Sequence, residues 1–286
     1  MQIEVKNVTK RYRKKEALKN VSFKLEGPKI YGLLGRNGAG KTTFMDILAG
    51  HNLATSGEIT INGKSPFDNR EVLQNICLIK EGDNFYKDLR IKQIYKAYSY
   101  FYPNWDQELA DRLTEEYGLN KNARFKTLSK GMGSAVGIIV GLASKAPITI
   151  FDEPYIGLDA AARKKFYNIL LEEYEKEKRM VIFSTHLIDE VSLLFEEILI
   201  LQEGELILQE HADQLRKQSF SVTGEISEVE KFIENKYVME TKKLANMMTA
   251  FVYGSPAETE ATNLRIEGMP IQDLIIYLTE KGKEAN

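Results

Sequence analysis

The sequence predicts an α/β fold built on a parallel sheet, followed by a small α+β domain at its C-terminal end. The first observation is an apolar run at 30–34 that leads into the glycine-rich stretch 35–43 and then into a helical pattern. The second is that the apolar runs 148–151 and 180–183 alternate with helical patterns, as the strands of a parallel sheet do. The third is that the pattern of strands and helices restarts late in the chain.

The composition narrows the class of protein. The 286 residues are 43% hydrophobic and 28% charged, which is typical of a folded globular chain. The net charge of −2 disfavours a nucleic-acid partner, because such proteins carry a basic excess. The single cysteine, Cys77, stands in an apolar run, which favours a buried thiol in a reducing compartment. Residues 1–5 alternate like a strand and do not resemble a signal peptide, and the apolar stretch 136–142 is too short to span a bilayer.

The glycine-rich stretch has the spacing of a phosphate-binding loop. Its glycines let backbone N–H groups approach phosphate oxygens, its lysine adds positive charge, and the next hydroxyl can bind Mg²⁺. The helix that follows adds the positive end of its dipole. A structural glycine turn is the alternative, but it does not require Lys-Thr at this spacing. We therefore expect phosphate contacts from Asn37, Gly38, Ala39, Gly40, Lys41, Thr42 and Thr43.

Polar side chains follow two of the apolar strands. Asp152 and Glu153 end the run 148–151, and His186 follows the run 180–183. Because ligands bind at the carboxyl ends of parallel strands, we expect these side chains to share one edge of the sheet. An acidic turn and a turn histidine are the structural alternatives. The other histidines, at positions 51 and 211, have no such setting.

Before the loop, residues 3–25 predict short alternating strands that stop at the Gly27-Pro28 break. Tyr12 lies there in a basic stretch, where an exposed loop residue is the default and an aromatic stacked on a purine base is the functional alternative. After the loop, 56–63 predicts a strand closed by an Asn62-Gly63 hairpin turn.

The segment from 82 to about 125 is rich in aromatic residues and lysines on helical patterns. Such residues can stack on nucleic-acid bases, but without a basic excess we favour the core and contact surface of a helical insert. Ser129 then caps a small-residue apolar helix that runs through Leu142.

The sequence after His186 predicts strands and helices but no cluster of catalytic or ligand-binding side chains. We expect a hairpin and a short helix to close a first domain over 1–217, and a second domain over 218–286 that serves packing or dimerisation. The predicted elements are strands at 197–201 and 205–209, a helix at 212–217, strands at 220–223, 248–253 and 264–266, a helix at 226–236, and a helix from Pro270.

Taken in order, these residues resemble the nucleotide-binding ATPase subunits of ATP-binding-cassette (ABC) transporters over about residues 3–217. The resemblance implies a P-loop NTPase fold of ABC ATPase type: a RecA-like core, an antiparallel β subdomain and a helical subdomain over about 82–145. It rests on GRNGAGKTT at 35–43 (Walker A), LSKGM at 128–132 (signature), ITIFDEP at 148–154 (Walker B), IGLD at 156–159 (D-loop) and STH at 184–186 (switch histidine).

The resemblance implies roles for the loop and the strand ends. Lys41 and the loop backbone would hold the β and γ phosphates of ATP, while Thr42 and Asp152 would hold Mg²⁺. Glu153 would polarise the attacking water and His186 would contact the γ-phosphate, so that the catalytic set is Glu153, His186 and Lys41. Phosphoryl transfer asks the protein mainly for positioning and charge stabilisation, which these residue types supply.

It also implies a second subunit. Tyr12 falls where the family places its adenine-stacking aromatic. Ser129 and Gly131 would cap the ATP bound to another copy, and Asp159 would lie at the same dimer seam. We therefore expect an ATP-bound homodimer that drives a separate integral membrane subunit from the cytoplasmic face of the membrane, with no nucleic acid.

Three positions depart from the family's pattern. Glu81 replaces a glutamine that contacts the metal, and as a carboxylate it accepts but cannot donate a hydrogen bond. The signature reads LSKGM in place of LSGGQ, which adds Lys130. Tyr155 stands where a small or hydroxylic residue is common, so ATP binding is expected more firmly than the hydrolysis rate.

The helical insert with YFYPNWD, the signature and the short tail resemble bacterial two-component exporters. Within that group, DEPYIGLDAAARKKF is most like the ATPase subunits of the staphylococcal exporter of phenol-soluble modulins, which implies export of amphipathic peptides. The alternatives are an exporter of other drugs or lipids, a soluble ABC-type ATPase that acts on nucleic acid or ribosomes, and a P-loop small-molecule kinase.

Overall fold

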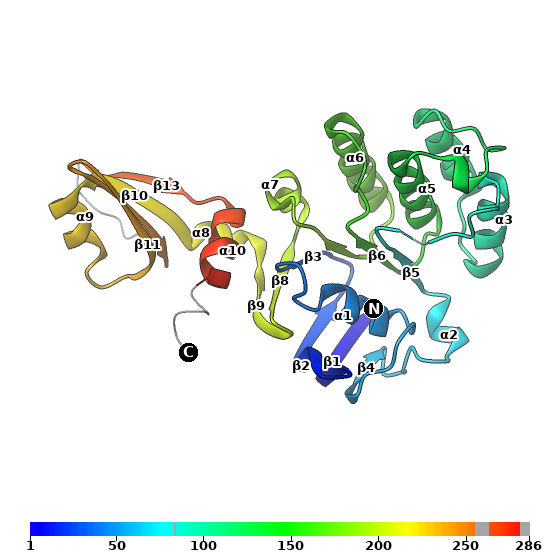
Figure 1. Cartoon of the computed structure of the whole chain (residues 1–286), viewed down its shortest axis with the longest axis horizontal. Helices are drawn as coiled ribbons and strands as arrows, with labels where there is room; N and C mark the ends of the chain where they lie inside the picture. The colour runs from blue at the N-terminus through cyan, green and yellow to red at the C-terminus, as the bar shows by residue number, and fades with distance from the viewer. Residues whose placement is uncertain (83, 255–262, 281–286) are drawn as a thin grey trace. The chain divides into compact units, whose positions relative to one another are not determined.

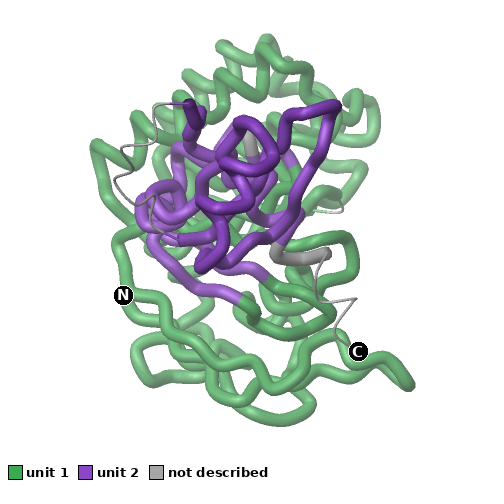
Figure 2. The backbone as a smooth tube through the Cα atoms, turned by 90° about the vertical axis from the view of Figure 1, so that its left-hand side faces the viewer, with its two compact units in different colours: residues 1–186, 201–207 green, residues 187–200, 208–286 purple. Residues whose placement is uncertain are grey.

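The computed structural model describes residues 1–82, 84–254 and 263–280, and its contacts divide the chain into two compact units. The first unit comprises Met1–His186 and Leu201–Ile207, and the second comprises Leu187–Ile200 and Leu208–Asn286 (Figure 2). The second unit thus takes in two stretches that precede the boundary we expect at residue 217.

A parallel sheet forms the centre of the first unit. Its strands are β5 (Ile76–Ile79), β6 (Ile148–Asp152), β7 (Met180–Ser184) and β3 (Ile30–Leu34), in that order, and neighbouring strands pair in parallel. The strands β8 (Glu197–Gln202) and β9 (Glu205–His211) follow in the strand order, and their residues are divided between the two units. The residues of β3, β6 and β7 are buried throughout, as the unbroken apolar runs predict for strands covered on both faces.

An antiparallel sheet accompanies it, in the order β2 (Lys15–Glu26), β1 (Gln2–Tyr12) and β4 (Ser56–Ile61). The N-terminal stretch therefore forms two long strands, interrupted by register shifts, in place of several short ones. The Asn62-Gly63 turn closes only a single bridge between Ile61 and Lys64, and β4 pairs instead with β1. The predicted strand and its Asn62-Gly63 turn are thus both present, with Ile61 and Lys64 hydrogen-bonded across the turn, whereas the pairing of β4 with β1 is not visible in a local turn signal.

Helices cover the parallel sheet on both faces: in Figure 1, α5 and α6 lie on one side of it and α1 on the other. Four of the helices begin at side-chain caps, since Asn69, Asp106, Ser129 and Asp159 accept hydrogen bonds from the first turns of α2, α4, α5 and α6. The helices are α1 (Lys41–Leu48), α2 (Arg70–Leu73), α3 (Ile91–Phe101), α4 (Gln107–Glu116), the 3₁₀ turn η1 (Phe125–Thr127), α5 (Lys130–Ala143) and α6 (Ala160–Lys176).

The aromatic residues of the helical insert divide between core and surface. Phe85 and Tyr95 are buried, and the Phe85 ring meets the edges of Tyr98 and Phe125. By contrast, the side chains of Tyr86, Tyr100 and Phe101 are largely exposed. Cys77 is buried in β5, and this burial raises the pKa of its thiol, in keeping with its prediction as a small core residue.

The second unit contains an antiparallel sheet in the order β11 (Tyr237–Leu244), β12 (Met247–Tyr253), β10 (Ser219–Glu225) and β13 (Arg265–Gly268). Its apolar face packs with α9 (Ile226–Ile233) around Phe220, Val229 and Val252. The strand β11 is not among the predicted elements, and α9 ends three residues before the predicted helix at 226–236 does. The remaining elements are α7 (Ile188–Val191), the 3₁₀ turn η2 (Ser192–Leu194), α8 (Ala212–Lys217) and α10 (Ile271–Glu280).

Among the described residues, none of the helices is both long enough and apolar enough to cross a membrane.

Candidate functional site

The glycine-rich loop joins β3 to α1 and turns sharply where the helix begins. Gly40 precedes the first helical residue with a φ of 108°, and a Cβ built on it would lie 2.5 Å from the Ala17 carbonyl oxygen, so only glycine is accommodated. Lys41 is buried and its Nζ donates to the Gly35 carbonyl oxygen at 2.7 Å and to that of Arg36 at 3.3 Å. These two carbonyl groups of the loop therefore hold the Lys41 ammonium group in place.

Burial lowers the pKa of Lys41, and the nearby carboxylates of Glu153 and Asp152 act in the opposite direction. Anionic groups nearby stabilise the charged form of the buried Lys41 ammonium. A bound phosphate chain would add several such negative charges. The loop, the helix N-terminus and the lysine therefore converge on one place for an anion.

Asp152 is the last residue of β6 and is held on both of its oxygens. Thr42 Oγ1 donates to Asp152 Oδ2 at 2.7 Å, and Ser184 Oγ donates to Oδ1 at 2.6 Å. The register of the parallel strands sets Asp152 beside Ser184, which explains why the second contact forms. Two hard oxygen donors from different elements, Thr42 and Asp152, thus meet beside the loop.

Glu153 follows Asp152 in the left-handed backbone region, with a φ of 51°. This conformation is uncommon for a residue with a side chain, and it turns the chain just after the strand end. The Glu153 side chain lies beside His186, whose Nδ1 is 2.8 Å from Glu153 Oε2. The two strand-end side chains that we expected to share an edge therefore meet there.

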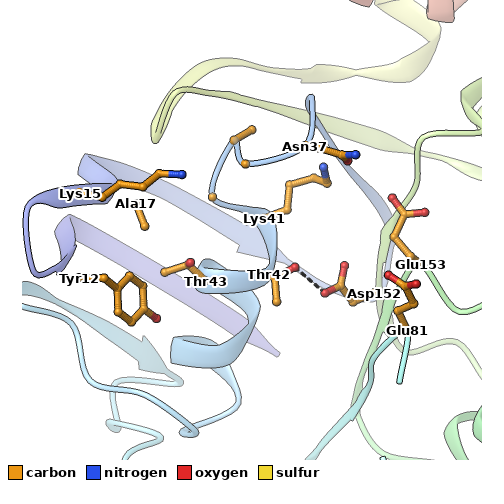
Figure 3. A pocket seen from close by; sticks show the side chains of 13 residues that line it. Tyr12, Lys15, Ala17, Asn37, Lys41, Thr42, Thr43, Glu81, Asp152 and Glu153 are labelled. Atoms are coloured by element: carbon orange, nitrogen blue, oxygen red, sulfur yellow. Dashed lines mark hydrogen bonds between the residues drawn. The ribbon is translucent and has the colours of Figure 1, made fainter. Parts of the chain in front are cut away.

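A cavity of about 430 Å³ lies between the loop and these carboxylates. Figure 3 shows Thr42 bonded to Asp152, with Glu153 and Glu81 on the same side of the loop and Tyr12 and Lys15 on the opposite side. The lining residues are Tyr12, Lys15, Ala17, Asn37, Gly38, Ala39, Gly40, Lys41, Thr42, Thr43, Glu81, Asp152 and Glu153.

Tyr12 lines this cavity and is 43% exposed. Asn52 Nδ2 donates to its hydroxyl at 3.0 Å, and Lys10 Nζ lies 4.9 Å from the ring centre. An aromatic face held in this way can stack on a flat ligand ring. Lys15 is a further cation on this wall that the sequence does not reveal, because one lysine in a basic run gives no signal of its own.

Ser129 and Gly131 do not line the cavity. The Ser129 hydroxyl accepts a hydrogen bond from the Met132 N–H at 3.2 Å and so caps α5. A Cβ on Gly131 would lie 2.4 Å from the Gly157 carbonyl oxygen, so the signature and D-loop segments touch within the chain. Asp159 likewise caps α6, accepting from the Ala162 N–H at 2.8 Å. None of these three residues therefore lines the cavity of its own chain.

The chemistry of the donor set fits a magnesium nucleotide. Mg²⁺ is usually held by one or two protein oxygens together with substrate phosphates and waters, and Thr42 and Asp152 supply such a pair. The described part of the chain contains no cluster of three or more His, Cys, Asp or Glu side chains placed to hold a metal.

Comparison with known proteins decides the family. The model of the family described as ABC transporter matches residues 18–156. The uncharacterized ABC transporter ATP-binding protein MJ1023 of Methanocaldococcus jannaschii is 32% identical over 199 residues, which cover 67% of this chain and 71% of that protein. The chain belongs to the ABC transporter ATP-binding proteins.

Two further relatives are transport ATP-binding proteins of bacteria. YtrB of Bacillus subtilis is 28% identical over 189 residues, covering 66% of this chain and 65% of that protein. The bacitracin transport ATP-binding protein BcrA of Bacillus licheniformis is 31% identical over 198 residues, covering 68% and 64%. The chain thus spans slightly less than two thirds of the length of these two relatives.

Solved structures of ABC cassettes have the same fold as this ABC ATPase. The structure of an ATP-binding subunit of an ABC transporter superposes with a TM-score of 0.68 at 25% identity, covering 76% of this chain and 93% of that one. The cassette MJ0796, solved as a dimer in a post-hydrolysis state with ADP and Pi, gives 0.66 at 24% identity, covering 73% and 98%. The expected P-loop fold of ABC ATPase type is confirmed.

Proposed function

We propose that this ABC ATPase hydrolyses Mg-ATP in a homodimer and drives a separate membrane subunit of a bacterial exporter. The observation that carries the hydrolytic part is the juxtaposition of Lys41, Thr42, Asp152 and Glu153 around one cavity. A kinase needs a site for a second substrate, whereas a hydrolase needs only a carboxylate facing water, which Glu153 supplies.

The residues divide the work of hydrolysis. The water oxygen bonds to the γ-phosphorus as the bond from phosphorus to the β–γ bridging oxygen breaks, and ADP leaves with that electron pair. Glu153 accepts the water's proton, while Lys41 and the loop N–H groups stabilise the charge on the β and γ phosphates. Thr42 and Asp152 would hold the Mg²⁺ that neutralises the phosphate oxygens when it is bound.

Two copies are needed in this proposal because Ser129 and Gly131 lie outside the cavity of their own chain. Each copy would then offer its signature segment to the ATP held by the other, which is a symmetric arrangement of two identical half-sites. The dimeric structures of the cassette MJ0796 support this arrangement for a relative with the same fold.

Membership of the ABC transporter ATP-binding proteins supports the proposal of a membrane partner. A subunit of this kind would act at the cytoplasmic face of the membrane on a polytopic partner. The YFYPNWD insert and the LSKGM signature favour a two-component exporter. The stretch DEPYIGLDAAARKKF favours the phenol-soluble modulin type within that group, with amphipathic peptides as cargo. Lipid or drug export is the alternative; the glucosylceramide transporter ABCA12 of Mus musculus is 32% identical over 200 residues, which cover 67% of this chain and 8% of that protein.

The hydrolytic part is tested by phosphate release from Mg-ATP. We expect Glu153→Gln to keep ATP binding and to lower the rate by about a hundredfold or more, because it removes the proton acceptor. A wild-type rate in this variant would show that the assigned base is wrong. The variant Lys41→Ala should lose ATP binding itself, which separates a binding defect from a chemical one.

The membrane part is tested separately by affinity capture of the full chain from detergent-solubilised membranes of its source organism. We expect one polytopic protein to co-purify with the chain. Less of it should be recovered when the membranes are omitted. Recovery of ribosomes or salt-sensitive RNA in its place would favour the soluble alternative.

A further inference from the structure

Tyr155 lies at the centre of the strand-end cluster. Its side chain is 2% exposed, and its hydroxyl contacts Glu153 Oε2. The same hydroxyl lies 2.7 Å from Thr185 Oγ1, 3.2 Å from the His186 backbone nitrogen and 3.3 Å from His186 Nδ1. One phenol oxygen therefore touches groups from the ends of both β6 and β7.

The direction of each hydrogen bond follows from the groups involved. An ionised carboxylate can only accept, so the single proton of the Tyr155 hydroxyl is donated to Glu153. The backbone N–H of His186 can only donate, and the Thr185 hydroxyl then donates to the remaining lone pair. The proton and both lone pairs of the Tyr155 hydroxyl are thus used, so the donor and the acceptor of each of these hydrogen bonds are fixed.

His186 holds the same carboxylate oxygen. Because Glu153 Oε2 accepts, the proton of the His186 ring lies on Nδ1, 2.8 Å away. Tyr155 and His186 therefore both donate to Oε2. Among the described residues, the hydrogen bonds to the Glu153 carboxylate all go to Oε2, so the lone pairs of Oε1 are available to another partner.

The ring of Tyr155 is set by packing. It stacks on Phe183 with ring centres 6.3 Å apart and an interplanar angle of 16°. Burial, together with the hydrogen bond to Glu153, raises the pKa of the Tyr155 hydroxyl, so it stays protonated and remains a donor. A small hydroxylic side chain at position 155 could not span the same distance.

We propose that Tyr155 is a positioning residue for hydrolysis: it donates to Oε2 of Glu153 and, with His186, orients Oε1 toward the attacking water. This inference rests on the proposed function of Glu153. Tyr155 departs from the family's pattern, and the inference gives this tyrosine a role: it holds the Glu153 carboxylate in one orientation.

The test compares Tyr155→Phe, Glu153→Gln and the double variant by single-turnover hydrolysis and by nucleotide binding. Tyr155→Phe keeps the ring and should lower kcat about tenfold, because the carboxylate loses its fixed orientation. Its ATP Kd should change by less than about twofold, and in the Glu153→Gln background it should cause no further loss.

The matched control is Tyr95→Phe. Tyr95 is also 2% exposed and its hydroxyl lies 2.8 Å from Thr114 Oγ1, but no carboxylate joins that pair. Tyr95→Phe should lower the Tm to a similar extent and leave kcat unchanged. If Tyr155→Phe does not fold, Thr185→Val carries the test, since it removes a contact of Tyr155 and keeps the ring; it too should lower kcat only when Glu153 is present.

Three results separate the possibilities. A kcat within about twofold of wild type in a folded Tyr155→Phe would overturn the inference and leave the role of Glu153 intact. An equal loss in the Glu153→Gln background would show a general structural defect, which also overturns it. Wild-type hydrolysis by Glu153→Gln alone would overturn the proposed function instead.

Discussion

Lys130 Nζ lies 3.1 Å from Glu81 Oε1, so the two charged departures from the family's motifs pair with each other. Lys130 opens α5 and Glu81 follows β5 on the cavity wall, 49 residues apart in the chain. Both side chains are more than half exposed, at 62% and 54%, so the pair contributes only about 0.2–1 kcal/mol. Lys130 nevertheless competes with any cation that approaches Glu81.

We therefore predict that Lys130→Gln lowers the Mg²⁺ concentration needed for half-maximal ATP binding. The small energy of the pair limits this change to about fivefold. The control is Lys126→Gln, which breaks a comparable exposed pair with Asp88 at 2.6 Å that does not line the cavity. An unchanged Mg²⁺ requirement in Lys130→Gln would remove Glu81 from the metal's surroundings.

A second prediction concerns acid stability through Glu173. This carboxylate is 3% exposed on α6 and accepts from Lys145 and Lys176, each at 2.7 Å, and from Arg112 at 3.2 Å. Burial alone would raise the pKa of Glu173, but the hydrogen bonds from Lys145 and Lys176 outweigh it and hold the pKa below 4.5. A carboxyl whose folded pKa lies below its unfolded value stabilises the fold above that unfolded value, and this contribution is lost as the pH falls through the folded pKa.

Glu173→Gln should therefore lower the Tm at neutral pH by roughly 6–12 °C, which corresponds to about 3 kcal/mol for a broken buried pair. The gap between variant and wild type should close as the pH falls below about 4. Glu116→Gln is the control, because Glu116 pairs with the same Arg112 but is 34% exposed, and it should cost less than about 1 kcal/mol. A gap that stays constant with pH would contradict the account.

A third prediction separates two glycines of α5. A Cβ on Gly131 would lie 2.4 Å from the Gly157 carbonyl oxygen, whereas a Cβ on Gly133 would meet the Phe125 ring at an ordinary 3.5 Å. Gly131→Ala should displace the 157–159 segment and abolish ATP-dependent dimerisation, measured by size-exclusion chromatography. Gly133→Ala should dimerise like the wild type, and equal behaviour of the two variants would refute the close packing.

The elements that the sequence predicted well are those with local signals. The α6 helix spans 160–176 and has such a signal at its start, where Asp159 caps it. The buried strands stand out as apolar runs, and their polar ends identified Asp152, Glu153 and His186. The strand β11 gave no signal, because it lies at the edge of its sheet with most of its side chains partly or fully exposed, so its residues do not alternate.

What the sequence could not show are contacts between distant residues. The hydrogen bond between the hydroxyls of Tyr155 and Thr185 joins residues 30 apart, and Glu153, two residues before Tyr155, turns the chain in the left-handed region. At the sequence level Tyr155 was only a departure that placed the hydrolysis rate in doubt. The Glu81–Lys130 pair was likewise two unrelated departures until strand and helix brought them together.

The central claim is that each ATP is held by Lys41 of one copy and capped by Ser129 of another, and a mixing experiment tests it most directly. Lys41→Ala and Ser129→Arg should each be inactive alone. In a mixed dimer, one site combines the intact loop of one chain with the intact signature of the other. An equal mixture should therefore recover about a quarter of the wild-type phosphate release, because half of the dimers are mixed and each has one working site. A mixture as inactive as its components, or full activity of Ser129→Arg alone, would contradict the shared site.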